Sequence, residues 1–385
     1  MDFGKASACL PVFAAVALYL AAGTAARSQD ETYLTAYSAY NAALKAGDGA
    51  AATRHALSAW QAAEQALGDD RLTAILAYNY GRLVLFDNTN EARTALQRAR
   101  ELHETGVADL SANHVRLYSN YAEFAADGYT RRQADALRES LQAFGPDGAE
   151  DNPDLATMWL RLATHDVMEE RYFKARESAA SAEAVIRRVA SDSTYGLAEA
   201  ILLGAVARLA PYPRTAEDVR AAQDGFDRAI RLFPPQKDLD NFDPLLAKLL
   251  AWDKAADSAR ETLAVENDTD GEDAETEASP PRPPLFEYQQ DVSVDCGEIE
   301  WLERKAPHYP SRALREGTIG AVFLGYQLGE DLKVRDARVL AEVPIARFGD
   351  AAVQAITEWQ AKELPTGGPE CYRNLTTWIM FMIER

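Results

Sequence analysis

The sequence predicts a multidomain chain: an all-α helical-repeat region, then a small α+β domain with a three-stranded antiparallel sheet and helices. Residues 31–259 are rich in Ala, Leu, Glu, Arg and Gln with short polar breaks, a helix-forming composition. Apolar residues alternate from Val322 to Leu328, typical of a strand with one face on a core and the other toward solvent or a partner. A chain of 385 residues has room for two or three domains.

Changes in composition divide the chain into four segments. We expect a signal peptide at residues 1–28, helical repeats at 30–262, a linker at 263–295 and the small domain at 296–385. The linker is acidic at first and then carries a proline-rich run at 280–284. Because such a composition cannot bury an apolar core, we expect a disordered tether, with a spacer that lets the small domain search as the alternative.

The N-terminus has the form of a secretory signal peptide. An apolar run from Ala8 to Ala22 is followed by small residues, with cleavage expected near Ala26 or Ser28. The run is shorter than the ~20 residues that span a bilayer. The chain is therefore predicted to be exported, and an uncleaved membrane anchor is the alternative because the segment before the run is only weakly basic.

Two cysteines remain once a signal peptide is removed, Cys296 and Cys371. An even pair in an exported chain indicates a disulfide. Closing a loop of this length would stabilise the fold by ~4 to 5 kcal/mol in the chain-entropy model. The alternative is a pair of unpaired, buried thiols.

The helical region carries a repeat of small or apolar residues seven positions apart. The pairs are Ala52/Ala59, Ala92/Ala99, Ala134/Leu141, Ala175/Ala182 and Ala222/Ala229. In the fourth unit Trp159, Leu162 and Ala163 precede the alanine pair, and in the fifth Gly204 precedes it. This arrangement resembles a degenerate tetratricopeptide array, with units nearer ~40 than the usual ~34 residues. Stacked helix pairs of this kind form binding surfaces; a plain spacer or platform is the alternative.

Composition and motifs argue against several functions. The net charge of −20 disfavours nucleic acid and anionic membrane surfaces as partners. No phosphate loop, nucleophile elbow or metalloprotease helix is present, and the histidines lack metal-ligand spacing, standing at His55, His103, His114, His165 and His308. We therefore expect no enzyme activity, no cofactor and no metal; a site assembled from scattered residues is the remaining enzymatic alternative.

The C-terminal fifth of the chain carries an ordered set of motifs. Two strand-like runs are followed by a helix with one apolar stripe and then by a last alternating strand, in the order strand, strand, helix, strand. The individual positions are Tyr309, Pro310, Ala313, Gly317, Gly320, the run Val334–Leu340, Pro344, Phe348, Ala352, Ala355, Ile356, Trp359 and the run Asn374–Ile383.

Taken together, these motifs resemble the C-terminal domain of the TonB family over residues 303–383, with Tyr309, Pro310, Gly317, Gly320, Phe348 and Trp359 as the family motif. Two positions depart from the family pattern. Leu332 follows Asp331 where the family usually has Gly, and Pro365 lies further from Trp359 than usual. We expect these departures to affect loops rather than the fold.

The resemblance implies a binding mode. The last strand of TonB domains pairs with a short peptide near the N-terminus of outer-membrane TonB-dependent receptors, by strand addition. On this chain the pairing strand would be 373–381, with Arg373, Asn374, Thr376, Trp378 and Met380 as its binding residues. A second copy of the domain, which would make a homodimer, is the alternative occupant of this edge.

The preferred interpretation is a periplasmic TonB-like protein in TonB-dependent transport. TonB proteins that act as energy transducers keep an N-terminal membrane helix, whereas this chain carries a predicted signal peptide, so we favour an adaptor over an energised transducer. An inner-membrane anchored form is the alternative location. The alternative function is a periplasmic helical-repeat scaffold for envelope assembly, in which the repeats bind other envelope proteins.

Overall fold

The computed structural model describes residues 30–126, 128–145, 152–190, 192–210, 215–234, 243–267, 299–316, 320–343, 347–365, 371–373 and 375–381. The chain divides into two compact units, Met1–Met158 and Trp159–Arg385. The predicted signal peptide at 1–28 lies outside the described residues. Within the described ranges, every helix is too short or too polar to cross a membrane.

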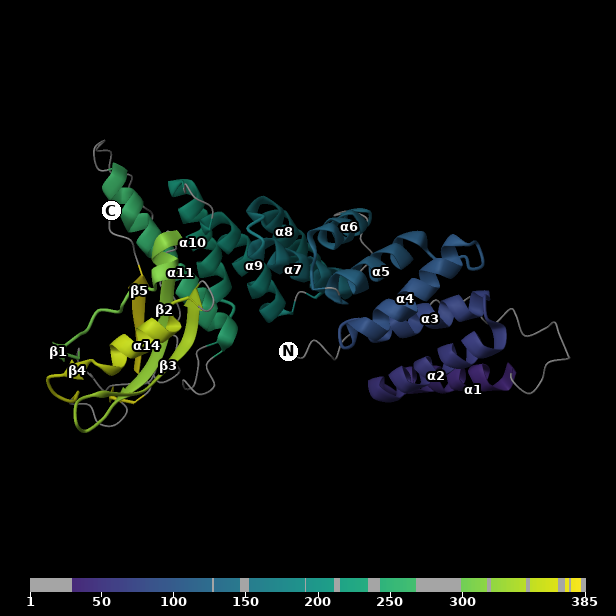
Figure 1. The fold of residues 1–385 in the computed structure, drawn as a ribbon, viewed down its shortest axis with the longest axis horizontal. Helices are drawn as coiled ribbons and strands as arrows, with labels where there is room; N and C mark the ends of the chain where they lie inside the picture. The colour runs from purple at the N-terminus through teal and green to yellow at the C-terminus, as the bar shows by residue number, and fades with distance from the viewer. Residues whose placement is uncertain are drawn as a thin grey trace. The chain divides into compact units, whose positions relative to one another are not determined.

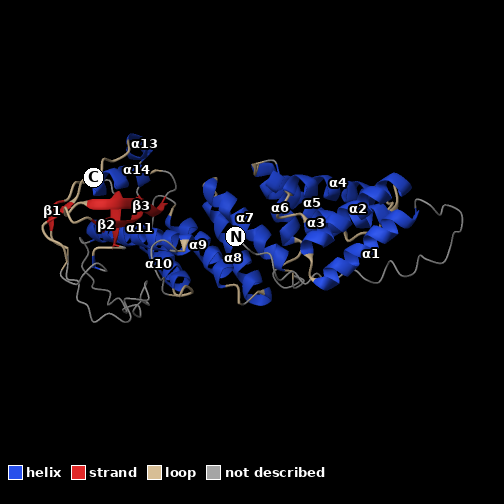
Figure 2. Cartoon of the chain, turned by 90° about the horizontal axis from the view of Figure 1, so that it is seen from below, coloured by secondary structure: helices blue, strands red, loops and turns tan. Residues whose placement is uncertain are grey.

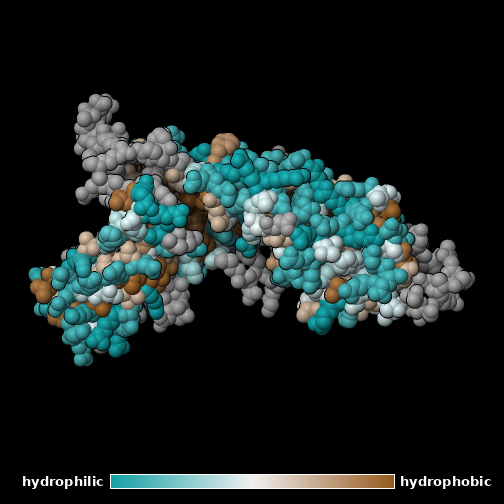
Figure 3. Space-filling model, in the orientation of Figure 1, coloured by the Kyte–Doolittle hydropathy of each residue, from teal (hydrophilic) through white to brown (hydrophobic). Residues whose placement is uncertain are grey.

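The first unit consists of helices that pack in sequence order (Figure 1). They are α1 (Asp30–Ala46), α2 (Gly49–Leu67), α3 (Arg71–Leu83), α4 (Thr89–Glu104), α5 (Ala112–Ala126), α6 (Arg131–Gln142) and the start of α7 (Pro153–Met168). Each helix from α1 to α5 contacts the next along the chain, so the unit is a stack of helical hairpins. In Figure 3 the visible surface of this unit is mostly hydrophilic, as the acidic composition leads one to expect.

The second unit begins with the rest of α7 and continues with more helices, followed by the C-terminal domain (Figure 2). The helices are α8 (Tyr172–Val189), α9 (Thr194–Leu209), α10 (Ala216–Ile230) and α11 (Pro244–Asn267). α11 covers the first five residues of the predicted linker, and residues 268–298 lie outside the described part. The disorder of the linker therefore stays a prediction.

The helical hairpins repeat with a constant interval. Their first helices begin at Asp30, Arg71, Ala112, Pro153 and Thr194, each 41 residues after the one before. The prediction of units nearer forty than thirty-four residues is thus confirmed over five units. Membership of the tetratricopeptide family itself stays a prediction.

Close packing of the second helix of each hairpin explains the seven-residue pattern. Every member of the five predicted pairs is buried, on α2, α4, α6, α8 and α10, at Ala52, Ala59, Ala92, Ala99, Ala134, Leu141, Ala175, Ala182, Ala222 and Ala229. Two turns of a helix bring positions seven apart to the same face, and small side chains there let neighbouring helices approach closely. Trp159, Leu162 and Ala163 are buried on α7, the first helix of the fourth pair, as predicted.

Side-chain caps fix where most of these second helices begin. Asp48, Asn88, Thr130 and Thr215 each accept a hydrogen bond from a backbone N–H in the first turn of α2, α4, α6 and α10. Thr130 forms a full capping box with Gln133. Because each cap satisfies otherwise unpaired helix N–H groups, it contributes about 1 kcal/mol and places the hairpin turn at a defined residue.

The C-terminal domain contains the predicted antiparallel sheet of three strands, in the order β3-β2-β5. Its elements are β1 (Trp301–Glu303), α13 (Ser311–Glu316), β2 (Gly320–Leu328), β3 (Val334–Val343), α14 (Gly349–Thr357), β4 (Gln360–Ala361) and β5 (Leu375–Phe381). The predicted order of strand, strand, helix and strand is confirmed as β2, β3, α14 and β5. A short second sheet of β1 and β4 was not predicted, because runs of two or three residues carry no readable period.

One face of the sheet packs on α14. The inward side chains of β2 and the predicted apolar stripe form one core cluster, which contains Val322, Leu324, Tyr326, Leu328, Phe348, Ala352, Ile356 and Trp359. The remaining member of the stripe, Ala355, is also buried. Phe348 and Trp359 flank α14 rather than lie within it. Glu342 accepts a hydrogen bond of 3.1 Å from the Phe348 N–H and another from the Gly349 N–H, so a carboxylate caps the start of α14.

The other face of the sheet is covered by α11, which contacts β2 and β3. Ala321 and Phe323 point to this face; Phe323 is 1% exposed and stacks on Trp378 with ring centroids 4.2 Å apart. The expectation of a face open to solvent or a partner is therefore wrong for β2, whose second face packs on a helix of the same chain. The apolar run 321–324 is unbroken, which is typical of a strand buried on both faces, whereas strict alternation is typical of a strand buried on one face.

The turn between β2 and β3 keeps the shape that a Gly would favour. Leu332 has a positive φ of 64°, in the left-handed region. This conformation costs a non-glycine residue about 1 kcal/mol. The Leu332 side chain packs against the core cluster, which offsets that cost. Leu332 therefore adopts a conformation that Gly adopts at lower cost.

Candidate functional site

The three-stranded sheet has two outer strands, β3 and β5, with β2 between them. Among the described residues, neither outer strand is paired along its outer side with a further strand of this sheet; only the start of β3 meets the β4 segment, through a bridge between Lys333 and Gln360 and a hydrogen bond from the Val334 N–H to the Trp359 carbonyl oxygen. Each therefore presents backbone N–H and C=O groups that a further strand could bind. The properties of the two edges decide which one suits a partner.

The β3 edge carries the features by which proteins prevent unwanted strand pairing. Arg335, Asp336 and Arg338 are exposed charged residues on this strand. The β2–β3 pairing shifts register twice, and Asp336 has a positive φ of 50°. Charges and irregular backbone at an edge both oppose the addition of another strand. β3 is therefore a poor acceptor of an extended peptide.

The β5 edge lacks those features. From Leu375 to Phe381 the strand has no charged side chain, and it pairs with β2 over seven consecutive positions without a register shift. Its residues are β-branched, aromatic or otherwise apolar, and most are only half-buried. A regular, uncharged and partly exposed edge is suited to strand addition. The described strand starts at Leu375, inside the predicted range 373–381.

The register places the β5 side chains on two faces. Leu375, Thr377, Ile379 and Phe381 pair with β2 residues of the α14 face, and Ile379 and Phe381 are buried there. The predicted binding residues Thr376, Trp378 and Met380 lie on the opposite face and are half-buried. Arg373 is exposed just before the strand, and Asn374 lies outside the described residues.

Three aromatic rings hold the end of β5 in place. Tyr309 makes edge contacts with Phe348 and Phe381, at ring-centroid distances of 5.7 and 5.6 Å. Phe348 and Phe381 stack on each other at 4.4 Å. Gly320 lies beside them, and any Cβ there would overlap the Phe348 ring and the Val343 carbonyl oxygen. These contacts explain three positions of the motif, Tyr309, Gly320 and Phe348, as a structural support for the candidate edge.

Of the remaining motif residues, Trp359 holds the other end of the domain. The Trp359 indole N–H donates to the Lys305 carbonyl oxygen at 2.9 Å, and the Arg304 guanidinium lies 4.3 Å from the ring centroid. Trp301 packs on the same ring in an edge geometry, at 5.0 Å. Pro310 accepts the backbone hydrogen bond of Leu314 at the start of α13. Gly317 lies outside the described residues.

The tyrosines near the site stay neutral at physiological pH. Burial raises the pKa of Tyr326 to about 12, although the nearby Arg304 charge opposes part of that shift. Burial also raises the pKa of Tyr309. Both side chains therefore act here as neutral packing groups that carry a hydroxyl.

Only one of the two cysteines of the predicted disulfide lies within the described residues. Cys371 is buried, with 3% of its surface exposed, four residues before β5 begins. Cys296 lies outside the described residues, so the Cys296–Cys371 pairing stays a prediction. In the part of the chain that the structure describes, no group of His, Cys, Asp or Glu residues is arranged to hold a metal ion.

Comparison with known proteins supports the domain assignment. The family of Gram-negative bacterial TonB protein C-terminal domains matches residues 305–382. With the strand order and motif contacts described above, this match makes the C-terminal residues a TonB-type domain, which belongs to a transport-associated periplasmic domain family. The match covers the C-terminal fifth of the chain and does not include the helical repeats.

Two solved structures show a distant likeness to the chain. One is an assembly chaperone of RpL4 (Acl4, residues 1–338), with 16% identity and a TM-score of 0.34, covering 62% of this chain and 92% of that one. Another is BtubC (BKLC) from P. vanneervenii, with 12% identity and a TM-score of 0.28, covering 66% of this chain and 98% of that one. No curated protein matches the sequence.

The sequence analysis did not predict the charge difference between the two sheet edges, although the charged residues responsible for it can be read in the sequence. Arg335, Asp336 and Arg338 interrupt the second strand run, whereas 375–381 is uncharged. The contrast has meaning only once both strands are known to be outer strands, and strand order is not encoded in a local pattern.

Proposed function

We propose that the chain is a periplasmic TonB-like adaptor whose β5 edge binds N-terminal peptides of outer-membrane transport receptors by strand addition. The observation that carries this proposal is the contrast between an uncharged, regular β5 edge and a charged, irregular β3 edge. Backbone hydrogen bonds would supply much of the affinity, and side chains next to the strand would supply selectivity.

A lysine scan of the two edges tests the proposal in the full chain. The full chain is needed because α11 covers the second face of the sheet, and removing α11 would expose Phe323. Thr376→Lys places a charge on the β5 edge, and Val339→Lys places the same charge on β3, where the valine is already exposed. Lysine at an edge opposes strand pairing.

Binding is measured with labelled synthetic peptides from the N-termini of outer-membrane transport receptors. Thr376→Lys is expected to weaken binding about tenfold, which corresponds to about 1.4 kcal/mol, while Val339→Lys leaves it unchanged. Circular dichroism checks that both variants fold. Equal loss in both variants, or loss only in Val339→Lys, would contradict the proposed edge. Sedimentation of the free protein shows whether a second copy occupies β5 instead.

The adaptor role rests further on the predicted cleavage of the N-terminal segment. If residues 1–28 are removed, the chain has no attachment to the inner membrane through that segment and acts without direct energy transduction. Mass spectrometry of the mature N-terminus in cell fractions tests this point. A start near Ala26 or Ser28 in the periplasmic fraction is expected, and an intact Met1 in the membrane fraction would contradict the adaptor role.

A further inference from the structure

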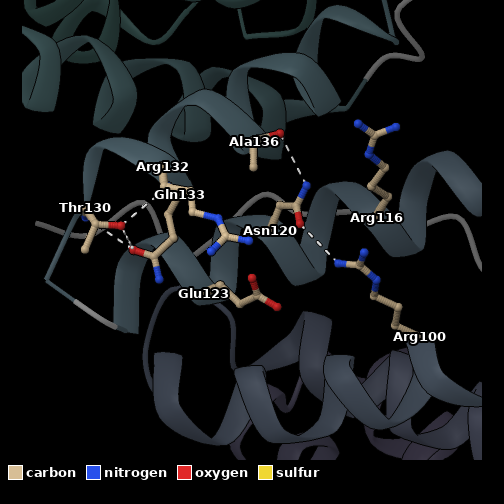
Figure 4. A pocket seen from close by; sticks show the side chains of 8 residues that line it. All are labelled: Arg100, Arg116, Asn120, Glu123, Thr130, Arg132, Gln133 and Ala136. Atoms are coloured by element: carbon tan, nitrogen blue, oxygen red, sulfur yellow. Dashed lines mark hydrogen bonds between the residues drawn. The ribbon is translucent and has the colours of Figure 1, made fainter.

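The first unit contains a polar hollow of about 640 Å³, bordered by α4, α5 and α6 (Figure 4). Its size lies within the ~300 to 1,000 Å³ range of ligand sites. Three of its lining side chains are arginines, one from each helix: Arg100, Arg116 and Arg132. The one acidic side chain in the lining is Glu123. Arg100 also forms an ion pair of 2.7 Å, through Nε, with Glu104, which does not line the hollow.

A buried amide positions the first of these arginines. Arg100 donates from Nη1 to Oδ1 of Asn120 at 3.2 Å. Asn120 is 7% exposed, and its own amide group donates to the Ser140 hydroxyl at 2.7 Å and to the Ala136 carbonyl at 3.3 Å. Because all three hydrogen bonds constrain the same side chain, the Arg100 guanidinium is held at the wall of the hollow.

The other two arginines differ in how far they are neutralised. Arg116 forms an ion pair of 2.6 Å with Glu139, an exposed pair that contributes little to stability. Arg132 is exposed, and it makes no hydrogen bond or ion pair with any residue in the described ranges. Its guanidinium points toward the middle of the hollow, near Asn120 and Glu123 (Figure 4). An extended, unpaired cation directed into a hollow is available for an anionic ligand.

We infer that this hollow binds an acidic peptide segment of a partner protein. Guanidinium groups bind carboxylates through paired N–H donors, a geometry that favours Asp and Glu side chains. The arginines come from separate helices around the hollow, so they fit several carboxylates along one chain better than a single compact anion. The net charge of −20 repels anions in general, but it opposes a nucleic acid, with its many phosphates, more than a short acidic peptide.

Fluorescence anisotropy of the full chain with a labelled hexaglutamate peptide tests this inference. Saturable binding is expected, and it should weaken as salt rises because the contacts are ionic. A hexaglutamine peptide should bind much more weakly. Arg132→Glu is expected to reduce affinity at least about tenfold, since a repulsive carboxylate replaces the free cation.

Arg131→Glu provides the matched control. It makes the same charge change on the neighbouring exposed residue, which does not line the hollow. Near-wild-type affinity in Arg131→Glu, with the loss confined to Arg132→Glu, is the expected result. Equal losses in both variants would mean unspecific attraction and would overturn the inference. So would the absence of saturable binding, or displacement of the peptide by an equal concentration of inorganic phosphate.

Discussion

The two edge strands of the C-terminal sheet pair with the same central strand but differ in charge and in the regularity of their pairing. β3 carries three exposed charges and pairs irregularly with β2, whereas β5 is uncharged and pairs without interruption. The same small domain thus has one edge that resists strand pairing and one that permits it. The features that oppose strand pairing are therefore present on β3 and missing on β5, as expected if β5 is the strand that binds a peptide.

The largest predicted effect concerns the aromatic support of β5. Phe381→Ala removes a side chain that is 1% exposed and contacts both Phe348 and Tyr309. The free energy of unfolding should fall by about 3 to 5 kcal/mol because a cavity replaces a packed ring. Val339→Ala on exposed β3 should change it by less than about 0.5 kcal/mol.

Urea denaturation, followed by tryptophan fluorescence, measures this pair of variants. Similar losses in the two variants would mean that β5 is no better anchored than β3. That result would weaken the comparison between the edges.

The second prediction concerns the start of β5. If Cys371 pairs with Cys296, the double substitution Cys296→Ser and Cys371→Ser should destabilise the domain by about 4 kcal/mol. Non-reducing peptide mapping identifies the bond directly. Adding reductant should lower the stability of the native protein but leave that of the double variant unchanged. Two alkylatable thiols in the denatured, unreduced protein would contradict the pairing.

The third prediction is a pH dependence. Burial raises the pKa of Tyr326 from 10.0 to about 12, so the unfolded chain loses this proton at lower pH than the folded one. The stability that this residue contributes is fully present below pH about 10 and declines as pH rises through about 12, by about 3 kcal/mol in total. Urea titrations at a series of pH values measure the decline. Tyr326→Phe should remove this part of the slope, and an unchanged slope would contradict the assignment.

The last prediction, with an effect visible only at high protein concentration, concerns the charges on β3. Replacing Arg335, Asp336 and Arg338 together with Thr should make this edge resemble β5. Weak self-association is expected, with a Kd near the millimolar range, or about 4 kcal/mol. Sedimentation velocity at increasing protein concentration detects it. If the triple variant stays monomeric at every concentration, the charges are not what protects β3.

Much of the fold was predictable because it depends on local periods. Alternation along 322–328 identified the strand face that packs on α14, and the stripe from Phe348 to Trp359 identified the helix that covers it. The alanine pairs seven apart located the helix crossings, since each lies at a buried contact. These patterns report which side of an element is buried.

The features that were missed depend on contacts between elements distant in sequence. Phe323 packs on the face covered by α11, a helix that ends more than fifty residues earlier, and no local period encodes that partner. Arg100, Arg116 and Arg132 border one hollow only because α4, α5 and α6 are stacked. The candidate strand was predicted through the family resemblance, whereas the reason that β5 rather than β3 suits a peptide needed the strand order.

Hydrogen exchange of the full chain, with and without a bound receptor peptide, tests the central claim most directly. If the peptide adds to β5, the outward-facing amides between Leu375 and Phe381 should gain protection, because each acquires a backbone acceptor. Amides of β3 should exchange as before. Protection that appears on β3 instead, or on neither strand while the peptide is bound, would contradict binding by strand addition at β5.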